Sequence, residues 1–368
     1  RRLPIGRARA SRAASWPAAG GWQPGGYSPP PPRRRRSFFG TLVRLAFVVV
    51  VAMFAFAVVR DALTGYSTGG ASAGSTAQPG TTTAGSSSGG GGTSAGGTGG
   101  TQYQNEGYQA PPADYDPSEL PSPTSYAQAE KWLTDNAVYA QNVPSPTDCT
   151  MEPIAAGASK AKLETELNAM MACLMQVWEP PVVAAGFEMP RPPVTVYSSQ
   201  VTTACGVMKE VNAAYCAGDQ HVYYASSLLQ ALPSQIGSTK YAAEDVIAHE
   251  FGHAVQARTG ILISDAALES RATKSDATVL ARRLEQQADC FAGLYVESVA
   301  QSQGLRQSDL QNLVDMTYYL GDDVLSGNPT IQGDHGQGKS RQAWFAKGLS
   351  TNRVGVCNTW IVPAAQVR

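Results

Sequence analysis

A pair of histidines four residues apart, His249 and His253, constrains this chain more than any other feature. The surrounding residues 242–257 contain no proline and are mostly good helix formers, so they predict a helix. Side chains four apart share one face of a helix, and two imidazoles on one face are a common way to bind zinc. Glu250 completes an H-E-x-x-H motif and lies at the rim of that face, where it can take a proton from water. The alternative interpretation is an ordinary helix with two surface histidines.

The first part of the chain is strongly basic. Residues 1–37 are rich in arginine and proline, and the first 44 residues contain ten arginines and no acidic residue. We expect 1–37 to be disordered, because of this composition. We also expect it to be cytoplasmic, because an apolar run follows it and basic residues that flank a membrane span stay in the cytoplasm. Nucleic-acid binding is another use for such arginines, but the apolar run that follows explains them better. We therefore expect no nucleic-acid partner.

That apolar run covers residues 38–60 and predicts a single transmembrane helix. Arg44 is the only charge between Phe38 and Val59, and the run approaches the ~20 residues that a bilayer span needs. A cleaved signal peptide is the alternative. The charged pair Arg60-Asp61 follows without a clean small-x-small site, which favours an uncleaved anchor. We expect a single-pass cell-membrane protein whose remaining chain is extracytoplasmic.

The composition changes twice after the apolar run. Residues 61–124 are rich in glycine, serine and threonine, and no charged residue falls between Asp61 and Glu106. This composition is typical of a flexible linker. Residues 125–368 have the composition of a folded domain and are numerous enough to bury one core.

Within that domain, sequence patterns predict helices more often than strands. Helical patterns cover 126–139, 155–178 and 278–300, in addition to the motif helix. Short strands are predicted at 192–197 and 221–224. We therefore predict an α+β fold, a mainly helical zincin-like domain with a small β-sheet.

The cysteines all lie in this domain, on the side expected to be exported. An even number of cysteines in such a location favours disulfides, whereas reduced buried thiols are the alternative. Fifteen pairings of six cysteines are possible. Proximity in the sequence favours Cys149–Cys173, Cys205–Cys216 and Cys290–Cys357.

A catalytic zinc site takes three protein ligands, so a third must come from another element. Glu285 is the best candidate, and Asp289 lies four residues later on the same predicted helix face. Asp289 can then accept a hydrogen bond from a ligand imidazole. A solvated helix face, mixed with Arg282 and Arg283, is the alternative. The apolar residues that follow favour the metal site, because acids in an apolar helix need partners.

The segments His249-Glu250-Phe251-Gly252-His253 and Glu285-x-x-x-Asp289 resemble the neutral zinc metallopeptidase family. That family is similar to the thermolysin-like gluzincins in using H-E-x-x-H plus E-x-x-x-D. The resemblance covers most of residues 180–360. It implies that His249, His253 and Glu285 bind zinc and that Glu250 is the general base. Further matching segments are Thr203-Ala204-Cys205-Gly206, Tyr215-Cys216, Gly321-Asp322-Asp323, His335-Gly336 and Arg341 with Trp344-Phe345.

The two remaining histidines are less clearly placed by the sequence. His335 lies in a glycine-rich loop, where it can hydrogen-bond the oxyanion of a tetrahedral intermediate or cap a helix that starts near Ser340. We treat His221 as structural. Tyr223 and Tyr224 fit the protein core better than a substrate cleft.

Together these features predict a membrane-anchored, extracytoplasmic zinc metallopeptidase with one Zn²⁺ per chain and peptide or protein substrates. Glu250 acts as the general base, and His335 is a second candidate catalytic residue. An anchored binding or assembly module with a structural zinc is the alternative, although such a site does not need Glu250. An amidase that acts on cell-wall peptides is a third possibility, without a wall-binding repeat to support it.

Overall fold

The structure is a computed structural model that describes residues 102–208 and 211–368. The predicted basic segment (1–37), the predicted transmembrane helix (38–60) and most of the predicted linker lie outside these residues. Within the two described ranges, we find no helix that combines the length and the apolar character needed to cross a membrane.

Helices form most of the described chain, and serine or threonine caps several of them. Ser125, Ser159 and Thr273 each accept a hydrogen bond from a backbone N–H in the first turn. One predicted helix, 126–139, is divided into α2 and the 3₁₀ turn η2. The helical elements are α2 (Tyr126–Thr134), η2 (Ala137–Ala140), α3 (Lys160–Ala184), α4 (Leu228–Ala231), α5 (Ser234–Gly237), α6 (Ala242–Arg258), α7 (Ile261–Glu269), α8 (Lys274–Val299), α9 (Gln307–Tyr319), α10 (Asp322–Ser326), α11 (Gly338–Leu349), η3 (Val354–Cys357), η4 (Thr359–Ile361) and η5 (Ala364–Val367).

Helix α3 is longer than the predicted range 155–178 at its C-terminal end, because it continues through two prolines. Pro180 and Pro181 lie inside the helix. A proline has no N–H to donate to the carbonyl four residues earlier, which for Pro180 is that of Gln176. The side chain of Asn105 donates to the Gln176 carbonyl instead, at 3.0 Å. A residue from outside the helix therefore supplies the missing donor.

The strands form a small sheet and a separate hairpin. The sheet has the order β1-β5-β4, with β1 and β5 parallel and β4 antiparallel to β5. Strands β2 and β3 pair antiparallel in the hairpin. The sequence predicts β1 and β5 but not the other three. The strands are β1 (Val194–Tyr197), β2 (Val201–Thr203), β3 (Gly206–Met208), β4 (Ala213–Cys216) and β5 (His221–Ala225). The predicted α+β fold, mainly helical with a small sheet, is confirmed.

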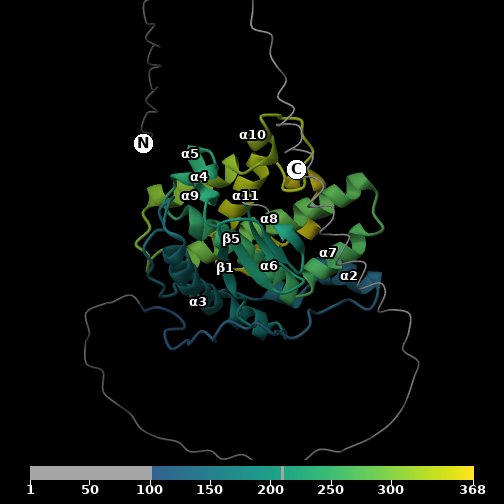
Figure 1. Ribbon diagram of the computed structural model, residues 1–368. Helices are drawn as coiled ribbons and strands as arrows, with labels where there is room; N and C mark the ends of the chain where they lie inside the picture. The colour runs from purple at the N-terminus through teal and green to yellow at the C-terminus, as the bar shows by residue number, and fades with distance from the viewer. Residues whose placement is uncertain (1–101, 209–210) are drawn as a thin grey trace, which may run out of the picture. The chain divides into compact units, whose positions relative to one another are not determined.

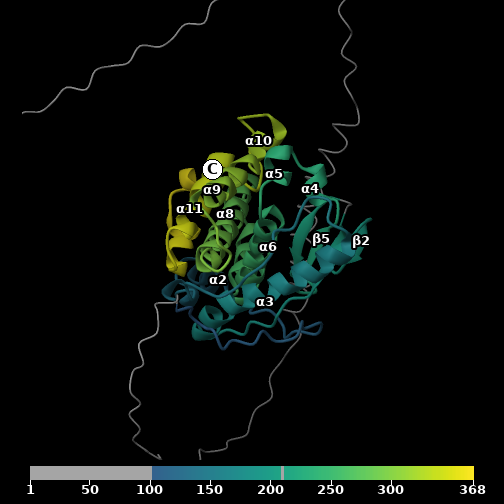
Figure 2. The same ribbon diagram turned by 90° about the vertical axis from the view of Figure 1, so that its left-hand side faces the viewer.

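Helices α6 and α8 pack closely at the centre of the fold, between the sheet and α11 (Figures 1 and 2). Gly252 of α6 permits this approach, since a Cβ there would lie 3.2 Å from the Cα of Ala288 on α8. On its other side α8 meets α11, where a Cβ on Gly348 would fall 2.0 Å from the carbonyl oxygen of Cys290. Two glycines therefore set the spacing of the three helices that carry the candidate site.

Residues 104–118, which we call the strap, lie against the domain instead of extending away from it. The Asp114 N–H donates to the Arg191 carbonyl at 2.9 Å. Arg258, the last residue of α6, donates to both the carbonyl and the hydroxyl of Ser118, at 2.8 Å each. We predicted a flexible linker over 61–124, but its described part is held by hydrogen bonds.

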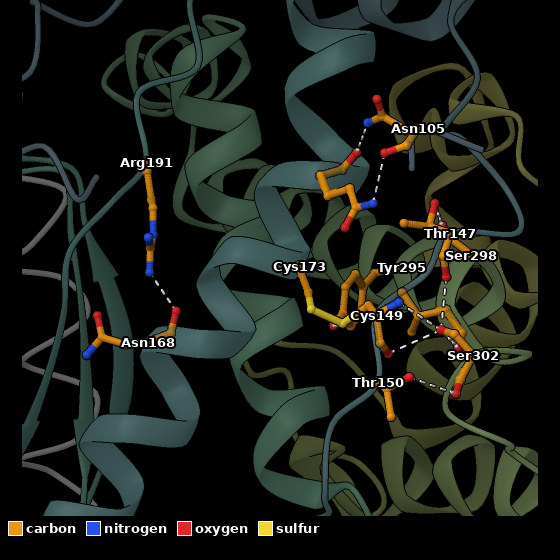
Figure 3. The surroundings of a disulfide bond; sticks show 12 residues. Asn105, Thr147, Cys149, Thr150, Asn168, Cys173, Arg191, Tyr295, Ser298 and Ser302 are labelled. Atoms are coloured by element: carbon orange, nitrogen blue, oxygen red, sulfur yellow. Dashed lines mark hydrogen bonds between the residues drawn. A yellow bond between two sulfur atoms is a disulfide. The ribbon is translucent and has the colours of Figure 1, made fainter. Parts of the chain in front are cut away.

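Three disulfides connect the cysteines in the pairing that sequence proximity favours, so that prediction is confirmed. They are Cys149–Cys173, Cys205–Cys216 and Cys290–Cys357. Figure 3 shows the first of them beside Ser302, whose hydroxyl accepts a hydrogen bond from the Cys149 N–H at 2.9 Å. The second connects the turn of the β2–β3 hairpin to β4. The third connects α8 to η3.

Candidate metal centre

The two motif histidines and Glu285 meet where α6 crosses α8. His249 and His253 face the same way on α6, with ring centroids 4.9 Å apart. Glu285 approaches from α8. One ligand atom from each of the three residues lies within 4.8 Å of the others, and all three side chains are partly buried. The third ligand candidate thus comes from the helix that the sequence indicated.

The distances from each imidazole to Glu285 are close to those between ligands of a zinc ion. The Nε2 atoms of His249 and His253 lie 3.3 and 3.5 Å from the two oxygens of Glu285. Zinc bonds to nitrogen and oxygen are about 2.0–2.1 Å long, so neighbouring ligand atoms around a tetrahedral ion are about 3.3–3.4 Å apart. Both separations are thus of the size expected between ligands of one Zn²⁺ ion, and three protein ligands would leave a fourth position open.

Asp289 fixes the orientation of the first ligand ring. Its Oδ1 lies 2.9 Å from Nδ1 of His249. Asp289 is itself held by Arg341 of α11, whose Nε and Nη2 donate to its two oxygens at 2.9 and 2.7 Å. Because Nδ1 of His249 donates to a carboxylate, its Nε2 is the nitrogen that is left to bind a metal. The structure thus places Asp289 where the sequence predicted and adds Arg341 behind it.

Gln256 fixes the second ligand ring. Its Nε2 donates to the Leu284 carbonyl at 2.7 Å and to Oε1 of Gln287 at 3.1 Å. With its amide nitrogen committed, its oxygen faces Nδ1 of His253 at 2.8 Å and accepts the proton there. The Nε2 of His253, which lies 3.5 Å from Oε1 of Glu285, is the nitrogen left to bind a metal. The sequence analysis assigned no role to Gln256, although its position three residues after His253 could have indicated one.

The candidate base, Glu250, is held at the edge of the sheet. Its Oε2 accepts a hydrogen bond from the backbone N–H of Tyr215 in β4, at 2.8 Å. Glu250 is 9% exposed, so it is desolvated yet not sealed from solvent. Strand β4 therefore adjoins the metal centre, a position that the sequence could not reveal because β4 itself was not predicted.

His335 lies near the metal centre and is held by Asp322 of α10. Its Nδ1 is 3.4 Å from Oδ1 of Asp322, and its own N–H donates to Oδ2 at 3.0 Å. The alternative role for His335, capping the following helix, is wrong. At the start of α11 the Gly338 N–H donates to Asp323, at 2.8 Å. The partly exposed imidazole is therefore available for another contact.

The charges of this cluster shift each other's pKa values. Burial lowers the pKa of His249, but hydrogen bonds with Asp289 and Glu285 outweigh it and raise the pKa to about 10. Burial raises the pKa of Glu285, yet the nearby His253 and His335 bring it well below its usual range. Such mutual stabilisation of imidazolium and carboxylate means that a metal must displace protons in order to bind.

The other residues singled out in the sequence are structural. His221 stacks on Tyr223 with ring centroids 4.5 Å apart, and its Nε2 lies 2.8 Å from the Thr195 hydroxyl. Tyr223 and Tyr224 are buried in the core. All three predictions agree with these positions, which are on the sheet and not among the metal-facing side chains.

The site brings together three side chains that could hold a metal ion, and sequence comparison identifies the family of the chain. The chain belongs to the family described as "Putative neutral zinc metallopeptidase", whose model matches residues 130–360. It is similar to "Uncharacterized protein YpfJ" of Escherichia coli strain K12, with 30% identity over 200 residues, covering 52% of this chain and 70% of that relative. It is also similar to "Uncharacterized protein Rv2575" of Mycobacterium tuberculosis strain H37Rv, with 32% identity over 204 residues, covering 50% and 66%. No solved structure matches the chain.

Proposed function

We propose that this protein is a zinc-dependent peptidase that hydrolyses peptide bonds with Glu250 as general base. The observation that carries the proposal is the convergence of His249, His253 and Glu285, whose ligand atoms lie within 4.8 Å of one another. Membership of the family and the presence of Glu250 between the two histidines of the motif support it.

The side chains around the metal centre have distinct parts in this reaction. A bound zinc ion supplies a Lewis acid that lowers the pKa of water and polarises a carbonyl. Glu250 takes the proton of the attacking water and delivers it to the leaving amine. His335, held by Asp322, donates a hydrogen bond to the oxyanion. Asp289 and Gln256 keep the ligand rings in one orientation.

Strand β4 offers a place for an extended peptide substrate. It is an edge strand of the sheet in the described part of the chain. The Ala225 N–H donates to the Asn212 carbonyl. In an antiparallel pair every second residue of a strand bonds to its neighbour, so the backbone groups of Ala213 and Tyr215 point away from β5. A substrate that added to this edge would pass beside Glu250, which already accepts a hydrogen bond from the Tyr215 N–H.

We also propose that the peptidase acts outside the cytoplasm, attached to the membrane by the apolar segment 38–60. The disulfides support an oxidising compartment. The arginines of 1–37 support a cytoplasmic N-terminus. This topology can be tested on intact cells with a membrane-impermeant thiol reagent. A cysteine introduced into 1–37 should be protected from the reagent, whereas one introduced after the apolar segment should be labelled.

The competing function is a non-catalytic module with a structural zinc. Structural zinc sites are closed by four protein ligands, whereas this one offers three, and Glu250 directly follows one of them in the sequence. That difference favours hydrolysis.

The test is the substitution Glu250→Gln. The variant should bind zinc with unchanged stoichiometry and lose at least about 10²-fold in turnover of a mixed peptide library. A matched control is Glu164→Gln, at an exposed site on α3. Turnover by the Glu250 variant at the wild-type rate would show that another group is the base, and absence of turnover in the zinc-loaded wild type would favour the structural module.

A further inference from the structure

Two buried glutamines connect the metal ligand His253 to η2 and η3. Gln256 on α6 and Gln287 on α8 are both fully buried. Oε1 of Gln256 faces Nδ1 of His253 at 2.8 Å, and its Nε2 donates to Oε1 of Gln287 at 3.1 Å. The Nε2 of Gln287 donates in turn to the Tyr139 hydroxyl at 3.0 Å and to the Cys357 carbonyl at 3.1 Å. These residues form a continuous chain of hydrogen bonds, which we call the amide relay.

The orientation of Gln256 matters because an amide has two unlike ends. With its oxygen toward His253, it accepts the proton of Nδ1 and leaves Nε2 for the metal. In the reversed orientation an N–H of Gln256 would face Nδ1. The neutral ring could then meet it only as an acceptor, which would move the proton to Nε2 and block the ligand atom. An amide at this position therefore has to be held in one orientation.

Two acceptors hold the amide nitrogen of Gln256. One is the Leu284 carbonyl at 2.7 Å, and the other is Oε1 of Gln287. Gln287 is itself an amide, so its own orientation has to be fixed as well. Its nitrogen faces the Cys357 carbonyl, which can only accept a hydrogen bond. With its nitrogen committed in this way, Gln287 presents its oxygen to Gln256.

The far end of the amide relay is fixed by backbone groups and by a disulfide. The Tyr139 hydroxyl donates to the Leu133 carbonyl at 3.1 Å, so its oxygen can accept from Gln287. Cys357 is joined to Cys290, which lies one turn after Gln287 on α8. The disulfide therefore keeps the Cys357 carbonyl beside its donor. Because both glutamines are fully buried, the loss of one partner leaves a polar group unpaired in the core.

We propose that Gln287 is a positioning residue for the metal ligand His253. The disulfide between Cys290 and Cys357 contributes to the metal centre as well, because it holds the carbonyl to which Gln287 donates. The amide relay is uncharged, unlike the ion pair behind the first ligand ring, so it acts through orientation alone. This inference rests on the metal centre of the proposed function and is independent of peptide hydrolysis. The alternative is a structural role, in which the glutamines only satisfy each other in the core.

The test measures zinc affinity of the full chain by competition with a chromophoric chelator. Gln287→Met keeps the approximate size but removes the acceptor for Gln256, and zinc affinity should fall about 10–100-fold. Gln287→Glu should retain the wild-type affinity, since in either protonation state a carboxyl oxygen can accept from Gln256. With Co²⁺ in place of zinc, the visible spectrum should change in Gln287→Met and stay as in the wild type in Gln287→Glu.

The disulfide provides a second test that needs no substitution at Gln287. Joint replacement of Cys290 and Cys357 by alanine should lower zinc affinity about 2–10-fold, the value of one neutral hydrogen bond. Joint replacement of Cys149 and Cys173 is the matched control, because it also removes a disulfide and Cys149 is hydrogen-bonded to Ser302, outside the amide relay. The control should be less stable to urea than the wild type but bind zinc equally well.

Each outcome has a distinct meaning. Wild-type zinc affinity in Gln287→Met would overturn the positioning role, and so would an equal loss in Gln287→Glu, which would indicate a packing effect. Equal losses of affinity on removal of either disulfide would reflect general destabilisation and overturn the role of the Cys290–Cys357 bond. Absence of zinc binding by the wild type would refute the metal centre and this inference with it. Absence of peptide hydrolysis by a zinc-loaded wild type that shows these affinities would contradict the proposed function alone.

Discussion

Replacing Arg341 with methionine should test how far the metal centre depends on a residue that cannot touch the metal. Arg341 and Asp289 form a buried pair, with side chains 7% and 3% exposed. Burial alone would raise the pKa of Asp289, but Arg341 holds it below the usual range. Methionine fills much of the space of the arginine side chain but leaves the Asp289 carboxylate buried without a cation. Breaking a buried ion pair in this way costs about 3–5 kcal/mol of stability. Because Asp289 orients His249, zinc affinity should fall about 10–100-fold.

Two measurements separate these effects. Urea unfolding of the metal-free protein gives the stability loss, and competition with a chromophoric chelator gives the zinc affinity. Adding Asp289→Asn to Arg341→Met removes the stranded charge and should recover part of the stability. Lys160→Met is the matched control, because Lys160 pairs with Glu164 through side chains that are 51% and 46% exposed, and it should behave like the wild type. A free energy of unfolding within about 1 kcal/mol of the wild type for Arg341→Met would refute the reasoning.

Three further substitutions test features outside the site. Burial raises the pKa of Glu244 to about 7, so its contribution to stability is present below about pH 4.5 and is lost as pH rises through about 7. The free energy of unfolding of Glu244→Gln, relative to that of the wild type, should therefore increase by up to about 3 kcal/mol as the pH rises from about 5 to about 8. Urea unfolding at each pH measures it. Gly293→Ala places a Cβ 2.2 Å from the Phe345 carbonyl oxygen and should cost about 1–3 kcal/mol, seen as a lower midpoint in urea. Joint replacement of Cys290 and Cys357 by alanine opens a loop with a sequence separation of 67 and should cost about 4 kcal/mol; a change below about 1 kcal/mol would contradict this.

The predictable parts of the site are those set by helical periodicity. The spacing of His249 and His253 fixes their common face, and the spacing of Glu285 and Asp289 does the same on the second helix. Each pair is local in sequence. Because imidazoles and carboxylates can bind the same metal ion, the two pairs can be predicted to meet in space. The apolar residues after Asp289 indicated correctly that this helix face is buried.

What could not be predicted depends on contacts between distant segments. Arg341 reaches Asp289 across 52 positions, and although its segment resembles the family, nothing in that segment indicates that Asp289 is its partner. Strand β4 is only four residues long and does not alternate clearly between polar and apolar positions, so the donor to Glu250 was missed.

The strap has a practical consequence for anyone who shortens this protein. By composition the domain starts near residue 125, and a truncation there would be the natural choice. Such a cut would remove Asn105, the donor to the carbonyl that Pro180 leaves unpaired in α3. It would also remove Ser118, two of whose oxygens hold the guanidinium at the end of the metal-bearing helix α6. A shortened chain should therefore begin no later than residue 102. Limited proteolysis should yield a resistant core that still contains the strap, and loss of the strap before the rest of the domain would show that it is dispensable.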